Sequence, residues 1–306
     1  MATPKQQYVK KLNDIAARYG QVEDETIRQS LAMLKQMQGE LAAHLSQVEG
    51  WEAYRIRELK ANVDRMIAEY QAQLTNRVQD AVRQAVISGE EYVIAPLGEI
   101  GIAANFYRPG RAQINTLLDF SADLVRGISD DLRATINDQI RRAALGQQSP
   151  FDAMKGITQA MGLDARTGIW KKRIDPVTGV AARAETILRT ELQRVYNLST
   201  YSQQLAVAQA VPGLLKGWIA TGDTRTRDSH LRAHVEYKDN PIPVGEPFIL
   251  KDAQGRAELM YPGDPQAPAR FTINCRCRPV TIHPAVGRVG SSLDGRIAAE
   301  LKRREE

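Results

Sequence analysis

A narrow stripe of apolar residues constrains the fold of this chain more than any other feature of its sequence. Between residues 56 and 82, apolar side chains recur at steps of three and four, and charged and amide side chains fill the positions between them. Such steps place the apolar side chains on one face of an α-helix. The stripe consists of Ile56, Leu59, Val63, Met66, Tyr70, Leu74, Val78 and Val82. With a start near Trp51 the helix would span roughly 50 Å, a length that favours a bundle or a partner surface.

A similar stripe precedes this helix, between residues 23 and 47, and Gly50 separates the two runs. A glycine between two helical patterns favours a turn, so the sequence predicts an antiparallel helical hairpin. Because the stripe from Ile56 to Val82 is long and narrow, we expect it to lie partly exposed in an isolated chain and to be covered by a partner in an assembly.

The helical pattern breaks at residues 88–111, where prolines and glycines accumulate, and resumes over residues 112–146. Ser149-Pro150 then predicts the N-cap and first residue of a short helix that continues to Ala160. Residues 1–165 are therefore predicted to form a helical docking or scaffold region.

The second half of the chain differs in pattern. Residues 162–180 are rich in glycine and proline and predict a domain boundary, after which a helix is expected over residues 181–210. Shorter apolar runs follow, and residues 215–220 predict a β-strand. We therefore predict an α+β fold in which the long helical N-terminal region precedes a small α+β domain at residues 181–284. Residues 285–306 are predicted to be a C-terminal tail with one short helix.

Residues 271–280, FTINCRCRPV, alternate between apolar and polar side chains. This alternation predicts a strand with Phe271, Ile273, Cys275 and Cys277 on one face. The two cysteines are the only ones in the chain. A disulfide across a single intervening residue would be strained, so we expect both thiols to be reduced or metal-bound, as in a reducing compartment.

Two interpretations of the cysteine pair are open. Cys275 and Cys277, together with His230 and His234 one helical turn apart, would supply two thiolates and two imidazoles for a tetrahedral Zn²⁺ site. Against it, Cys-x-Cys is a less common zinc spacing than Cys-x-x-Cys, and a flat strand holds the two sulfurs rather far apart. In the alternative interpretation, which the shared face favours, both cysteines are small buried hydrophobes and the chain has no cofactor.

Other polar residues of the C-terminal half also have more than one interpretation. His230 suits a metal ligand, a general base or, as the preferred hypothesis, a structural hydrogen bond. Arg225 could hold a phosphate or pair with a nearby carboxylate. A buried ion pair between Arg189 and Glu191, linking helix to sheet, is the role expected for those two residues, and Trp218 is expected in the core.

The charge composition indicates which classes of partner are possible but does not identify one. The 41 cations and 36 anions give a net charge of +5 and a pI of about 9.2, and the cations are spread along the chain. Such a balance permits contact with nucleic acid but does not require it. The N-terminal residues carry no apolar signal segment, and no run of about 18 apolar residues predicts a membrane span.

Five segments in a fixed order carry a family resemblance. They are ILRTELQRVYN, GWIATGDTRTRDSH, EPF, YPGDP and NCRC, within residues 181–283. In this order they resemble the Mu F-like family of phage head morphogenesis proteins. The family motif residues are Arg189, Glu191, Trp218, Arg225, His230, Asn274, Cys275 and Cys277.

The resemblance implies a minor capsid protein of a tailed bacteriophage with a structural role, and we expect no enzymatic activity. It implies partners in the portal protein, the major capsid protein and, non-specifically, the packaged double-stranded DNA, with no membrane partner and several copies in each virion. The expected location is the capsid interior near the portal vertex, and the host cytoplasm during assembly. The alternative hypothesis is a metal-dependent enzyme of phosphoester or nucleotide chemistry, with His230, Arg225, Asp228 and Glu191 forming a polar cluster.

Overall fold

The computed structural model describes residues 2–46, 53–103, 111–161, 179–287, 289 and 294–305. The chain divides into two compact units, each built from separated segments. The first unit combines residues 1–23, 82–117 and 190–306, and the second combines residues 24–81 and 118–189. The domain boundaries expected from the sequence stay a prediction.

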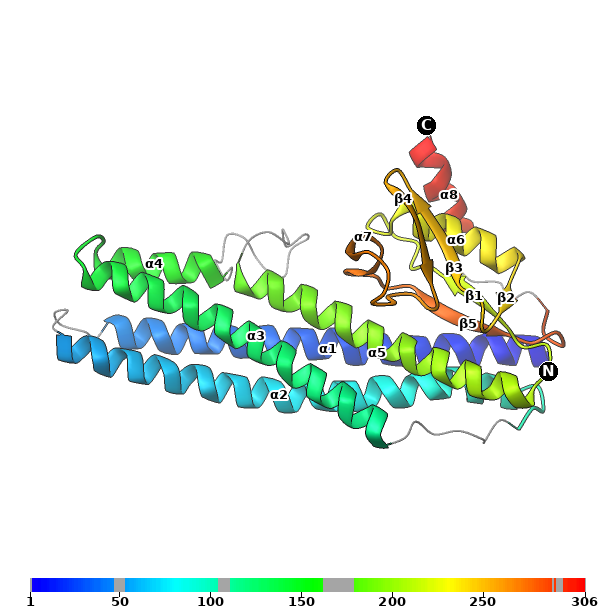
Figure 1. Ribbon diagram of the computed structural model, residues 1–306, viewed down its shortest axis with the longest axis horizontal. Helices are drawn as coiled ribbons and strands as arrows, with labels where there is room; N and C mark the ends of the chain where they lie inside the picture. The colour runs from blue at the N-terminus through cyan, green and yellow to red at the C-terminus, as the bar shows by residue number, and fades with distance from the viewer. Residues whose placement is uncertain are drawn as a thin grey trace. The chain divides into compact units, whose positions relative to one another are not determined.

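Long helices precede a short stretch of strands, which confirms the expected α+β class (Figure 1). The helices are α1 (Pro4–Ser46), α2 (Ala53–Gly98), α3 (Arg111–Ala144), α4 (Pro150–Met161), α5 (Val180–Ala210), α6 (Asp228–Asp239), α7 (Ala269–Thr272) and α8 (Asp294–Glu305). The strands are β1 (Leu215–Ile219), β2 (Ile242–Pro243), β3 (Phe248–Asp252), β4 (Gly255–Leu259) and β5 (Arg278–Ile282).

The apolar stripe of α2 is buried within the chain. Its residues from Leu59 to Val78 are at most 5% exposed. The same unit buries the apolar stripes of α1 and α3, which include Leu34 and Leu132. The expectation that this stripe lies partly exposed in an isolated chain is therefore wrong, because the neighbouring apolar faces supply enough surface to cover it. The predicted turn at Gly50 lies outside the described residues.

Helix α2 continues through the break predicted at residue 88 and ends at Gly98. Its last turns bury Tyr92, Val93 and Leu97 in the first unit, and this burial favours helix over loop. Pro96 falls in the final turn, so the one backbone hydrogen bond that it removes lies at the end of the helix. The predicted break begins too early, because the buried apolar side chains continue through Ser88 and Gly89 to Leu97.

Helices α3 and α4 follow the sequence pattern. Helix α3 covers the predicted run, and α4 begins at Pro150 as expected. The Ser149 hydroxyl accepts a hydrogen bond from the Asp152 amide at 3.1 Å and donates one to the Asp152 carboxylate at 2.7 Å. Ser149 therefore caps the helix through the backbone amide that the first turn leaves free.

In the first unit, aromatic side chains join three helices. The rings of Tyr19 in α1 and Tyr196 in α5 stack with centroids 4.2 Å apart, and Tyr92 in α2 lies against Tyr196 at 5.8 Å. The Tyr19 hydroxyl donates to the Leu192 carbonyl at 2.7 Å. Gly89 allows the close approach, because an added Cβ would lie 2.6 Å from the Tyr196 carbonyl oxygen.

Two small antiparallel sheets complete the unit. Strand β1 lies at the centre of the order β2-β1-β5, and β3 pairs with β4 as a hairpin. Helix α6 packs against both β1 and β3 (Figure 1). The core between them contains Trp218, Leu231, Phe248 and Phe271, each fully buried. The strand predicted near residue 215 is confirmed.

The strand predicted over residues 271–280 is wrong for most of its length. Ala269–Thr272 is a helical turn, and regular pairing begins only at Arg278. Ile273, expected on the buried face, is 41% exposed. Asn274 has φ of 56°, a left-handed conformation that no continuous strand contains and that asparagine tolerates better than most residues.

The expected C-terminal helix is confirmed as α8, which buries Ile297 fully in the core of the first unit. None of the described helices has the length and apolar character needed to cross a membrane.

Candidate metal centre

Helix α6 presents two buried histidines. His230 and His234 are each 1% exposed and lie one turn apart. The helix begins after Arg227, whose guanidinium donates to the Ile273 carbonyl at 2.6 Å. This bond ties the start of α6 to the loop that carries the cysteines.

The loop of residues 273–277 is fixed at several points. The Asn274 amide donates to the Thr190 hydroxyl at 3.0 Å, and the Arg276 guanidinium pairs with Asp223 at 2.8 Å. Thr221 donates to the Arg276 carbonyl at 3.2 Å. The left-handed turn at Asn274 and these contacts bring both cysteine side chains to the same side of the loop.

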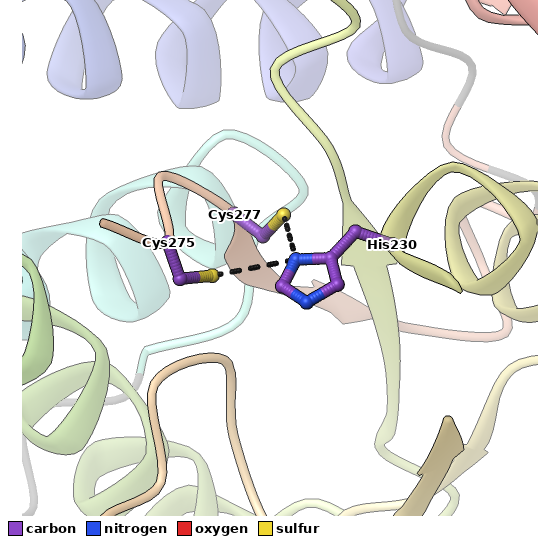
Figure 2. Close-up of side chains that lie close together, drawn as sticks. All are labelled: His230, Cys275 and Cys277. Carbon is purple, nitrogen blue, oxygen red and sulfur yellow. Dashed lines mark hydrogen bonds between the residues drawn. The ribbon is translucent and has the colours of Figure 1, made fainter. Parts of the chain in front are cut away.

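The two sulfurs and one imidazole nitrogen converge. His230 Nδ1 lies 3.3 Å from Cys277 Sγ and 3.6 Å from Cys275 Sγ, as the dashed lines in Figure 2 show. The three atoms lie within 4.8 Å of one another, and Cys275 and Cys277 are 3% and 1% exposed. Among the described residues this is the one group of metal-ligating side chains with such spacing.

The two thiols differ in acidity. Burial raises the pKa of the Cys277 thiol well above its usual range. The pKa of Cys275 lies well below its usual range, because the Cys277 thiol donates to its sulfur and His230 faces it. Cys275 is therefore the sulfur of the pair that more readily carries negative charge.

His234 is not part of this cluster. Its Nδ1 accepts a hydrogen bond from the Ala220 amide at 3.3 Å, and its Nε2 lies 3.0 Å from the Asp294 carboxylate. Burial lowers its pKa, which favours the neutral ring. Of the four predicted ligands, the structure brings together His230, Cys275 and Cys277 and places His234 in a separate link between β1, α6 and α8.

Two amide side chains of α5 hold the cysteine loop and were not singled out from the sequence. Gln193 and Asn197 both donate to the Cys277 carbonyl, at 3.2 and 2.9 Å, and Asn197 also donates to the Pro262 carbonyl at 2.7 Å. Both residues are buried. A signal was present, since the polar residues Thr190, Gln193, Asn197, Thr200 and Gln204 follow steps of three and four along one helix face.

The expected ion pair between Arg189 and Glu191 is wrong. Arg189 pairs with Glu185 at 3.2 Å, and Glu191 pairs with Arg194 at 2.5 Å. Residues two apart on a helix point to different faces, so partners three or four residues away are favoured. Burial raises the pKa of Glu191, whereas Arg194 lowers it. The link from α5 to the loops is made by Arg194, which donates to the Gly263 carbonyl at 3.0 Å.

Arg225 and Trp218 lie in the surroundings that the sequence predicts for them. Arg225 is 69% exposed and lies 3.6 Å from the Asp223 carboxylate, in line with the carboxylate partner expected for it. Trp218 is fully buried, as expected, and its ring meets the His230 ring edge-on at 5.4 Å. The indole therefore forms one wall of the thiol–imidazole cluster.

Fold and site together define a chain of long helices whose small α+β region encloses a buried thiol–imidazole cluster. Residues 152–280 match the family model described as Phage Mu protein F like protein. The match confirms the resemblance, and residues 152–280 are similar to this family. The matched segment begins within α4, earlier than the resemblance at residues 181–283. No curated protein and no solved structure matches the chain.

The family suggests a phage head morphogenesis protein, which fits a structural role, location in the virion and contact with other capsid components.

Proposed function

We propose that this chain is a minor capsid protein that lies inside the phage head near the portal vertex and binds the portal protein during assembly in the host cytoplasm. The observation that carries the proposal is the family match over residues 152–280. The major capsid protein is the second partner, and no enzymatic activity or membrane contact is part of the role.

The helical unit of residues 24–81 and 118–189 offers apolar surface for such a contact. Phe151 and Leu145 are 68% and 65% exposed, the highest values among the large apolar side chains that the structure describes. They flank the turn between α3 and α4. Leu145 also lines a cleft of about 520 Å³ between α2 and α3. Exposed apolar side chains beside a cleft are typical of protein contact sites.

Contact with the packaged DNA is the subordinate part of the proposal, because much of the described basic surface near the C-terminus is already paired. Arg303 pairs with Glu300, and Arg304 pairs with Glu300 and Asp228. The basic segment Lys171-Lys172-Arg173 lies outside the described residues. Any binding that uses the net charge of +5 would be electrostatic and would weaken steeply with salt.

The alternative enzyme hypothesis needs a polar cluster that the structure does not assemble. His230 faces the two cysteines, Arg225 lies beside Asp223, and Glu191 pairs with Arg194. Asp228, the fourth member, pairs with Arg304. With its members in four separate interactions, the cluster offers no shared substrate position.

The test measures binding of the purified chain to the portal protein and to the major capsid protein of its phage. We expect specific portal binding, and we expect the double variant Leu145→Ser, Phe151→Ser to weaken it by about 30-fold or more, because exposed apolar anchors contribute on the order of 1–2 kcal/mol each. Leu205→Ser, on α5 of the other unit and 37% exposed, is the matched control and should bind normally. A chain that binds neither protein would contradict the proposal.

A further inference from the structure

The thiol–imidazole cluster has the dimensions of a metal site. A tetrahedral Zn²⁺ ion with Zn–S of about 2.3 Å and Zn–N of about 2.0–2.1 Å separates imidazole nitrogen and thiolate sulfur by about 3.6 Å. The two distances in the structure, from His230 Nδ1 to Cys277 Sγ and Cys275 Sγ, are 3.3 and 3.6 Å. We propose that His230 Nδ1 and the sulfurs of Cys275 and Cys277 bind one Zn²⁺ ion.

The site is held in shape by contacts that do not involve the three ligands' own donor atoms. Arg227 and Thr190 hold the start of the loop at Ile273 and Asn274, and Gln193 and Asn197 hold the Cys277 carbonyl. A preformed arrangement lowers the entropy cost of metal binding. The turn at Asn274 also removes the objection that a flat strand would separate the two sulfurs.

Charge favours zinc in this buried position. Binding replaces two thiol protons, which pass to solvent, so that two thiolates and one neutral imidazole neutralise the Zn²⁺ ion. A neutral centre suits a core lined by Trp218 and Phe271, where an isolated charge would be costly. Thiolates and imidazoles are ligands that zinc favours, whereas magnesium and calcium favour oxygen ligands.

The fourth coordination position falls to a small ligand such as water. The chain has no further cysteine, and both ring nitrogens of His234 already have partners. Sets of two cysteines and one histidine occur in zinc sites that keep one position open. Here the buried ion would join α6 to the irregular segment between α7 and β5, a structural cross-link where regular strand pairing is missing.

The test begins with the full-length chain purified under reducing conditions and supplied with zinc or cobalt. We expect one Zn²⁺ per chain by elemental analysis. With Co²⁺ we expect the visible bands of a tetrahedral ion and the near-ultraviolet charge-transfer band of thiolate ligands. Wild-type chain that binds neither metal, or a cobalt complex without the thiolate band, would overturn the proposal.

Variants on one helix separate the site from general damage to the core. Cys277→Ser and His230→Gln should lose the metal, whereas His234→Gln, an equally buried histidine one turn away, should keep it. Retention of stoichiometric zinc by both Cys277→Ser and His230→Gln would also refute the site. If all three variants misfold, the wild-type cobalt spectrum decides. The proposal does not depend on portal binding, so each can fail without the other.

Discussion

Lys216 carries its ammonium group into the interior beside β1. The side chain is fully buried, with Nζ donating to the Met260 carbonyl at 2.7 Å and lying 4.7 Å from the ring centroids of Tyr201 and Phe248. Burial lowers the pKa of Lys216 from 10.5 to about 7, although Asp264 acts in the opposite direction. The native chain therefore gives up this proton more easily than the unfolded chain does.

This lysine makes stability depend on pH in a defined window. Between pH 7 and 10.5 the unfolded chain binds more protons at Lys216, so the free energy of unfolding rises with pH, by up to about 1.4 kcal/mol per unit. Below pH 7 both states are protonated and the contribution is flat. Urea unfolding at a series of pH values should show this slope, and Lys216→Met should reduce it. An unchanged slope in the variant would show that Lys216 titrates normally.

Asn274 is the only non-glycine residue with positive φ among those that the structure describes. Asn274→Ala should lower the free energy of unfolding by about 1 kcal/mol, because a Cβ without a local hydrogen-bonding group disfavours the left-handed conformation. Asn274→Gly is the control and should stay within about 0.5 kcal/mol of wild type. Equal losses in both variants, measured by urea unfolding, would mean that the asparagine side chain matters more than the backbone angle.

The residues of the site were only partly predictable from the sequence. Alternation in FTINCRCRPV imitates a strand, and only the backbone angle at Asn274 and the helical turn before it reveal the loop. The sequence spacing of His230 and His234 suggested a shared role, but Asp294 lies 60 residues further along the chain and draws His234 away. The contact of His234 with Asp294 leaves no local pattern, whereas the polar face of α5 that holds the cysteine loop does.

At the scale of elements, the approach of α2 to α5 depends on Gly89. An added Cβ would lie 2.6 Å from the Tyr196 carbonyl oxygen and 2.8 Å from the Ser199 Cβ, so the two helices would have to move apart. Gly89→Ala should therefore destabilise the chain by about 1–3 kcal/mol, although alanine normally favours a helix interior.

Gly20→Ala in α1 is the matched control, because its added Cβ meets nothing within 4 Å. It should stabilise the chain by about 0.5–1 kcal/mol through helix propensity alone. Thermal or urea unfolding of both variants gives the comparison. Stabilisation by Gly89→Ala would contradict the close packing of α2 on α5.

The spacing of apolar residues predicts whether a segment is a helix, but it does not always predict where the helix ends. The periodic runs of α3 and α5 predicted their helices closely, since apolar side chains at steps of three and four leave one stable solution. Helix α2 is longer than predicted. Its last turns are stabilised by the burial of Tyr92, Val93 and Leu97, which depends on other helices of the first unit. The element that covers an apolar stripe is also set by tertiary contacts. For this reason the sequence alone wrongly predicts that the stripe of α2 is partly exposed.

At the scale of the whole molecule, burial of the apolar stripes limits the apolar surface that remains for contact with a partner. The apolar stripes of the long helices are covered within their own unit, so they are not the surface left for a partner. The exposed side chains of Leu145 and Phe151 then leave a limited surface for contact. The match to the phage Mu F-like family suggests contact with other capsid components, and we propose this surface for that contact.

The most direct measurement is the detection of this chain in purified heads of its phage by quantitative mass spectrometry, before and after protease treatment of intact particles. The account predicts that the chain is present in DNA-filled heads, survives protease while the shell is closed, and becomes sensitive once the heads are opened. Absence from purified heads, or complete digestion in intact ones, would contradict a role inside the head.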